Sequence, residues 1–136
     1  MDYPYIDKEM KQYYFFVLLF SCFEKYQVEK SYNYYKRQYR NYLLLVKRKN
    51  KYITYKVDSR IVSFLFQIDS VEELVFDQVL FMELLELKES FHYNIAVIGY
   101  KKPREYYCSS FSDYLRLKNS SKRYRKERSG EEYGVS

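Results

Sequence analysis

Several residue types that mark common functional classes are scarce in this chain of 136 residues. It has two cysteines, one histidine and no tryptophan. Cys22 and Cys108 lie far apart with no further cysteine near either of them, so the sequence predicts neither a disulfide framework nor a Cys/His zinc site. This cysteine usage is typical of a reducing compartment, and we expect an intracellular, cytoplasmic protein.

Glycine and proline are also rare. Gly99, Gly130 and Gly134 are the three glycines, too few and too late in the chain for a phosphate-binding glycine-rich loop or a dinucleotide fingerprint. The two prolines, together with 19 Tyr and 10 Phe, exclude collagen-like and disordered compositions. We therefore expect a compact domain, and we predict no cofactor and no metal site.

No apolar run is long enough to cross a membrane. The most apolar stretch, residues 15–23, has about half of the ~20 residues that a spanning helix needs. The segment before it is acidic, whereas a secretory signal would be positively charged there. The run is predicted to be a core helix, and no membrane partner is expected.

What the chain has in abundance is charge that is segregated by sign. Residues 30–56 hold nine Lys or Arg and no acidic residue, whereas residues 58–90 hold eight Asp or Glu and two basic residues. Residues 116–128 hold seven basic residues and one Glu, a net charge equal to the +6 of the whole chain. Such separation of positive from negative residues is unusual on a surface whose charges serve only solubility, and it favours contact with a polyanion.

Hydrophobic periodicity predicts an α+β fold. Helical spacing and then strand alternation indicate N-terminal helices, a three-stranded antiparallel unit, an acidic helix, a fourth strand, and a short C-terminal helix with a basic tail. The expected ranges are helices over about 7–26 and 29–41, strands over about 42–47, 51–57 and 61–68, a helix over 71–89, a strand within 93–100, and a last helix after residue 110.

Two capping motifs support the later helices. Ser70 and Glu73 have the Ser-x-x-Glu spacing that begins a helix, and Ser110 and Asp113 repeat this pattern. Apolar content falls sharply after Leu117. We therefore divide the chain into one compact α+β domain, residues 1–117, and a basic flexible tail, residues 118–136.

The two cationic segments are the candidate phosphate-binding sites. One surface is expected to combine the end of the second helix with the tight turn between the first two strands, and the tail is expected to add a flexible second contact. The predicted nucleic-acid-binding residues are Lys36, Arg37, Arg40, Lys47, Arg48, Lys49, Lys51, Lys122, Arg123, Arg125, Lys126 and Arg128.

Tyrosines are interleaved with these basic residues. One helical stripe of tyrosines points away from the basic stripe, so we expect its members to pack inward. They are Tyr32, Tyr35, Tyr39 and Tyr42. Tyr52 and Tyr124 are better placed to stack on nucleic-acid bases.

These features favour a non-enzymatic nucleic-acid-binding accessory protein whose partner is DNA or RNA. The abundance of Lys, Tyr, Phe and Asn fits an AT-rich genome such as that of a virus or mobile element. The alternative is a protein-interaction or inhibitor module that docks a host protein, or a second copy of the chain as a homodimer, through complementary charged patches.

The expected order of helix, three strands, helix and strand resembles the core of restriction-type nucleases. That resemblance implies a metal ion held by an Asp and a following Glu-x-Lys. The chain has Asp77, Glu86 and Lys88, but on the predicted helix Glu86 and Lys88 project about 200° apart. The second alternative is therefore a fold of this kind without catalytic residues, and we assign none.

Overall fold

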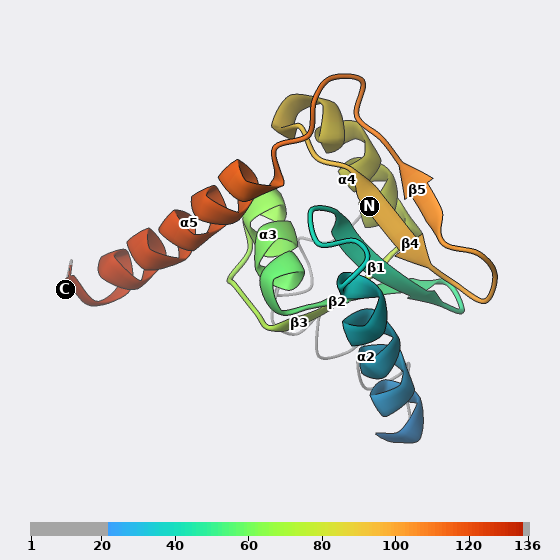
Figure 1. Ribbon diagram of the computed structural model, residues 1–136. Helices are drawn as coiled ribbons and strands as arrows, with labels where there is room; N and C mark the ends of the chain where they lie inside the picture. Colours follow the sequence, from blue (N-terminus) through green and yellow to red (C-terminus); the bar gives the residue numbers. More distant parts are fainter. Residues whose placement is uncertain (1–21, 135–136) are drawn as a thin grey trace.

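The computed structural model describes the backbone of residues 22–134 and the side chains of residues 24–124. A five-stranded mixed sheet, in the order β3-β2-β1-β4-β5, forms the centre of the fold (Figure 1). The α+β class expected from the sequence is confirmed. In chain order the elements are α2 (Cys22–Lys36), β1 (Leu43–Arg48), β2 (Lys51–Tyr55), α3 (Lys56–Phe66), β3 (Glu73–Asp77), α4 (Gln78–Phe91), β4 (Ile95–Ile98), β5 (Arg104–Tyr106) and α5 (Tyr114–Gly134).

The sheet has one parallel pair, β1 with β4, and its other neighbours are antiparallel. Val46 lies beside Ile98, and Lys51 lies beside Asp77. The β1–β2 turn and the carboxyl ends of β3 and β4 therefore meet at the same end of the sheet.

Helices cover both faces of the sheet. Leu43 and Leu45 pack with α3, α4 and α5, whereas Leu44 and Val46 pack with α2 on the other face. Because β1 is buried on both sides, it is apolar throughout its first four residues, as expected for a central strand. Ile95–Ile98 of β4 is buried in the same way, which confirms the strand predicted within residues 93–100.

The predicted strand over residues 61–68 is wrong, because α3 occupies most of this segment. Ile61, Val62 and Leu65 are buried at helical spacing, with Asp58 one turn earlier on the same side. Nearly every residue from 61 to 66 is apolar, so the segment fits a period of two as well as a period of 3.6. The alternation that predicted a strand over residues 61–68 is therefore coincidental.

The helix predicted over residues 71–89 begins later than expected. Residues 73–77 form β3, each paired with β2, and Leu74 and Phe76 face the opposite side of the sheet from Val75. The cap of α4 is Asp77, whose Oδ1 accepts a hydrogen bond from the backbone N–H of Leu80 at 3.2 Å. The Ser70 capping box is therefore wrong.

The ends of the described chain also differ from expectation. α2 covers most of the second predicted helix, while residues 7–21 of the first lie outside the described residues. β5 was not predicted. α5 begins at Tyr114 with Asp113 as its cap, since Asp113 Oδ1 accepts from the Arg116 N–H at 3.2 Å, so the expected cap at Ser110 is wrong.

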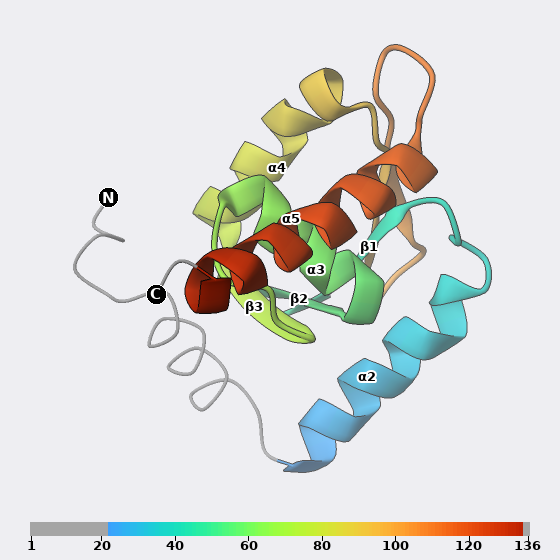
Figure 2. The same ribbon diagram turned by 90° about the vertical axis from the view of Figure 1, so that its left-hand side faces the viewer.

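The expected domain boundary after Leu117 lies inside α5. The helix continues to Gly134 and packs along α3, where Ser121 is buried and the Tyr124 ring lies 5.5 Å from that of Phe64. Figure 2 shows α5 lying across α3.

A buried carboxylate joins these layers. Asp58, in the first turn of α3, accepts hydrogen bonds from the hydroxyls of Tyr32 on α2 and Tyr114 on α5, each at 2.6 Å. The Lys36 amine lies 2.9 Å from Asp58 Oδ2. One fully buried side chain thus links α2 on one face of the sheet with α3 and α5 on the other.

The same carboxylate completes the hydrogen bonding of β1. Pairing between β1 and β2 reaches Val46 and Ile53 and goes no further along β1. Beyond it, the Leu44 N–H donates to Asp58 Oδ2 at 3.3 Å, and the Leu44 carbonyl accepts from the Thr54 hydroxyl at 2.8 Å. Buried backbone groups that leave the ladder are therefore still satisfied.

We expect Asp58→Asn to lower the free energy of unfolding by about 3–5 kcal/mol, because it removes one partner of a buried ion pair and leaves Lys36 uncompensated. Denaturant titration measures this loss. Glu86→Gln, the same chemical change at an exposed position of α4, should shift stability by less than about 0.5 kcal/mol. A loss below about 1 kcal/mol for Asp58→Asn would contradict the assignment of Asp58 as the central contact.

Alkaline pH should unfold the protein cooperatively. Burial raises the pKa values of Tyr32, Tyr93 and Tyr114 above the ordinary value of 10.0, and Asp58 raises those of Tyr32 and Tyr114 further. The folded state then holds protons that the unfolded state releases, so stability is complete below pH 10 and falls above it by about 1.4 kcal/mol per pH unit for each buried tyrosine. Tyrosinate absorbance and circular dichroism should therefore change together. Ionisation of all tyrosines before any loss of helix would contradict this.

Candidate nucleic-acid interface

A cleft of about 710 Å³ opens where the β1–β2 turn meets the loop between β4 and β5. It lies at the carboxyl ends of the parallel strands β1 and β4, a common place for ligands in sheets of this type. The described residues that line it include five basic side chains, three tyrosines and no Asp or Glu. These side chains are Lys47, Lys49, Lys101, Lys102 and Arg104, with Tyr52, Tyr100 and Tyr106.

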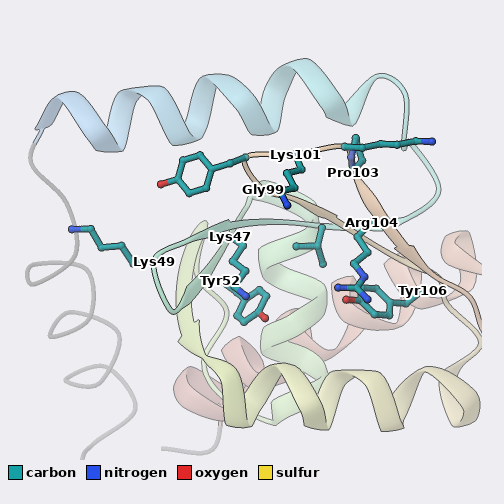
Figure 3. Close-up of a pocket in the computed structure, with 11 residues that line it drawn as sticks. Lys47, Lys49, Tyr52, Gly99, Lys101, Pro103, Arg104 and Tyr106 are labelled. Carbon is teal, nitrogen blue, oxygen red and sulfur yellow. The ribbon is translucent and has the colours of Figure 1, made fainter.

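Strand alternation decides which side chains enter the cleft. Tyr52 and Val97 belong to the core on the α4 side of the sheet, and Tyr106 packs against it. Figure 3 shows Lys47 beside Tyr52 and Arg104 beside Tyr106, both pairs extending toward α4, whereas Lys49 extends away.

Phe81 of α4 supports the aromatic floor of the cleft. The Tyr52 ring stacks on Phe81 at 4.2 Å between centroids and 5° between planes, and the Tyr106 ring meets Phe81 edge-on at 5.7 Å. The Tyr52 hydroxyl donates to Gln78 Oε1 at 2.8 Å. These rings are held by packing and give the cleft an apolar base.

The expectation that Tyr52 and Tyr124 are available to stack on bases needs correction. Tyr52 is 3% exposed, because its position on β2 faces the core. Tyr124 packs against Phe64 of α3. The inward packing predicted for the helical tyrosines is found: Tyr32 is buried beneath β1, and Tyr35, Tyr39 and Tyr42 are partly buried against the same core cluster.

Aromatic rings orient the basic side chains of the cleft. Lys47 Nζ lies 5.5 Å from the Tyr52 ring centroid, and Arg104 Cζ lies 5.8 Å from that of Tyr106. A cation–π contact positions a cation without cancelling its charge, as a carboxylate would. Within the described part of the chain, Lys47, Lys101 and Arg104 form no ion pair.

The electrostatic effect of this charge is visible at Tyr52. Burial raises the pKa of the Tyr52 hydroxyl, Tyr106 raises it further, and the positive charge of Arg104 acts in the opposite direction. Hydrogen bonds from the hydroxyls of Tyr107 and Tyr39 lower the pKa of the Glu105 carboxyl, and the charge of Lys102 lowers it further. The uncompensated charge in the cleft is therefore that of Lys47, Lys101 and Arg104.

The β1–β2 turn forms one side of the cleft. Lys47 and Lys49 line the cleft, and Arg48 lies beside it with its guanidinium 4.9 Å from the Tyr100 ring centroid. Lys49 also lies 4.0 Å from Glu24, and Lys51 is paired in register with Asp77 of β3.

The expectation that Lys36 belongs to an exposed phosphate-binding surface needs correction. Its amine contacts Asp58 and donates to the carbonyls of Tyr39 at 3.2 Å and Tyr42 at 2.7 Å. Burial lowers the pKa of this amine, and Asp58 opposes that shift. Lys36 is therefore used to hold α2 against the start of β1.

Arg37 and Arg40 do not share a surface with the β1–β2 turn. Both are exposed, but they lie between α2 and the amino end of β1. The turn lies at the other end of this strand, about 17 Å away. The single surface expected from the sequence is thus divided in two.

The basic residues of the predicted tail lie on α5. Lys122 and Arg123 are exposed, and Arg125, Lys126 and Arg128 lie further along the helix, beyond the described side chains. Figure 1 shows α5 extending to the opposite side of the molecule from the β1–β2 turn. The helix therefore presents its charge separately from the cleft.

The sequence reasoning missed the loop side of the cleft. Residues 100–104, Tyr-Lys-Lys-Pro-Arg, form a short basic run with one tyrosine immediately after a central strand. This run falls between the two long cationic segments, so a count over long windows overlooks it. Tyr100 is 83% exposed, which makes it an accessible aromatic side chain at the rim.

The residues considered for nuclease chemistry are dispersed. Asp77 was expected on a helix but ends β3 and caps α4, whereas Glu86 and Lys88 lie on α4, as expected. Among the residues that the structure describes, no group of three or more His, Cys, Asp or Glu could hold a metal ion.

No helix within residues 22–134 is both long enough and apolar enough to cross a membrane. Comparison with protein-family models, characterised proteins and solved structures finds no match. The function is therefore inferred from the geometry and charge of the cleft.

Proposed function

We propose that this protein binds nucleic acid, without enzymatic activity of its own, and that the cleft between the β1–β2 turn and the β4–β5 loop is its main contact. The observation that supports this most directly is the absence of carboxylates among the described residues that line the cleft, although five basic side chains gather there. A surface that only confers solubility has no need to collect cations in a concave site.

The physical basis is phosphate neutralisation. Lys and Arg that contact the backbone release condensed counterions, which supplies affinity without base contacts. The apolar base formed by Tyr52, Tyr106 and Phe81 lowers the local dielectric constant and strengthens such contacts. Acidic residues near the sheet have other roles: Asp58 is buried, Glu72 lies 2.7 Å from Arg60, and Asp77 caps α4.

α5 would provide the second contact. Its exposed Lys122 and Arg123 lie away from the cleft, so both regions can bind the same strand only if that strand is long enough to pass around the molecule. Short oligonucleotides should therefore depend on the cleft alone, whereas long ones should gain from α5 by multivalency.

A protein partner is the second candidate, and one observation favours it. On the outer face of α4, Val79 is 54% exposed and Met82 is 50% exposed, next to the exposed carboxylates of Glu83 and Glu86. A mixed apolar and acidic helix face of this kind suits a basic partner surface.

We expect the triple variant Lys47→Ala, Lys101→Ala and Arg104→Ala to bind DNA and RNA more weakly. The loss of affinity should depend little on the base sequence of the nucleic acid. Each phosphate contact that is lost should reduce the slope of log K against log salt by about 0.9. Electrophoretic mobility shifts at several ionic strengths, with single-stranded DNA, duplex DNA and RNA, measure both effects. The matched control is Arg37→Ala, Arg40→Ala and Lys56→Ala, which removes the same charge at the other end of the sheet.

Equal loss of binding in both triple variants would show that net charge, and not the cleft, determines affinity. If the unmodified protein ignores all three nucleic acids at low salt, the proposal fails, and the α4 face becomes the favoured site.

The α5 contact has its own test. Arg123→Ala, Arg125→Ala and Lys126→Ala together should weaken binding to long strands and lower the salt slope, while leaving short oligonucleotides unaffected. The same mobility-shift series, run with strands of increasing length, measures the difference. A loss that does not depend on strand length would contradict the proposed second contact.

A further inference from the structure

The dimensions of the cleft limit what can enter it. The cleft is partly open to solvent, and its volume of about 710 Å³ falls in the range of small-molecule pockets. A single nucleotide can enter a pocket of this size. A base pair, which carries a backbone on each side, cannot.

The basic groups of the cleft come from three separate segments. Lys47 belongs to β1, Lys101 to the β4–β5 loop and Arg104 to β5, and Figure 3 shows them around one opening. Because cations approach from several directions, a phosphate group that enters can be contacted through more than one oxygen. The packed rings beneath Lys47 and Arg104 hold these side chains in place.

Tyr100 adds an aromatic surface at the rim. Its ring is 83% exposed and has the Arg48 guanidinium at 4.9 Å from its centroid. A ring this exposed contributes little to the core, yet with one face held by Arg48 its other face remains open to a stacking base. The Tyr100 ring is suited to the base of a nucleotide, and the basic pocket beside it is suited to the phosphate.

Gly99 keeps the cleft open. It follows β4 directly and lines the cleft together with Val97. A Cβ atom added at this position would meet no atom within 4 Å, and its φ is outside the left-handed region. A larger residue here would therefore fill the cleft without straining the backbone or changing the charge.

Resting on the proposed function, we infer that the cleft takes one unpaired nucleotide of a single strand. Lys47, Lys101 and Arg104 contact its phosphate, and its base stacks on Tyr100. The protein therefore prefers single-stranded nucleic acid to duplex, since paired bases can neither enter the pocket nor reach the Tyr100 ring.

The test uses fluorescence anisotropy with the full chain, a labelled oligothymidylate and a duplex of equal length. Gly99→Leu should weaken single-strand binding at least tenfold and leave the weaker duplex binding unchanged. Tyr100→Ala should weaken single-strand binding by about tenfold, whereas Tyr100→Phe should not. Tyr34→Ala, at an exposed tyrosine of α2 outside the cleft, is the matched control and should have no effect. Circular dichroism confirms that each variant is folded.

The outcomes separate this inference from the proposed function. If Gly99→Leu binds the single strand normally while the Lys47, Lys101 and Arg104 triple variant does not, phosphates bind on the outer surface and the inference fails alone. If neither variant loses affinity, the proposed function fails as well. Equal loss for strand and duplex in Gly99→Leu overturns the preference for an unpaired nucleotide.

A competition experiment distinguishes binding of a nucleotide within a strand from binding of a free nucleotide. Thymidine monophosphate should displace the labelled strand only at far higher concentration than the unlabelled strand, and inorganic phosphate should displace it more weakly still. If thymidine monophosphate competes as well as the strand, the cleft is a site for free nucleotides and the assignment to a strand is wrong.

Discussion

The structure depends on one buried carboxylate. Asp58 is removed from water completely, which is costly for a charged group, yet Lys36, Tyr32, Tyr114 and the Leu44 N–H all donate to it or lie against it. These donors come from both faces of the sheet and from its central strand. The carboxylate therefore holds α2, α3 and α5 around β1, and the position of β1 in turn places the β1–β2 turn.

The cleft follows from that arrangement. Because β1 and β4 run parallel, the turn after β1 and the loop after β4 lie at the same end of the sheet, and their basic side chains meet. Phe81 supports Tyr52 and Tyr106, and these rings orient Lys47 and Arg104 without neutralising them. Residues 58–90, the acidic segment that follows in the chain, contribute no Asp or Glu to the lining of this cleft.

The local sequence was sufficient to predict a helix or a strand where its hydrophobic pattern fitted only one of the two periods. This was the case for the two strands on either side of the Lys47–Lys51 turn and for the strand Ile95–Ile98. Residue alternation, or a short apolar run buried on both faces, did not fit a helix there. Residues 61–66 are so uniformly apolar that both periods fit them. At Ser70 and Glu73 a capping motif occurs by chance, whereas pairing with β2, which lies some twenty residues earlier, makes the segment a strand.

By itself, the amino-acid sequence determined the α+β class, the separation of charge by sign and the cationic turn after the first strand, because composition and short-range periodicity encode them. Only the tertiary structure decided which charges remain at the surface. It buried Lys36 against Asp58, turned Tyr52 into the core and brought Lys101 and Arg104 beside Lys47. Burial and ion pairing depend on residues that are distant along the chain, so no local pattern contains that information.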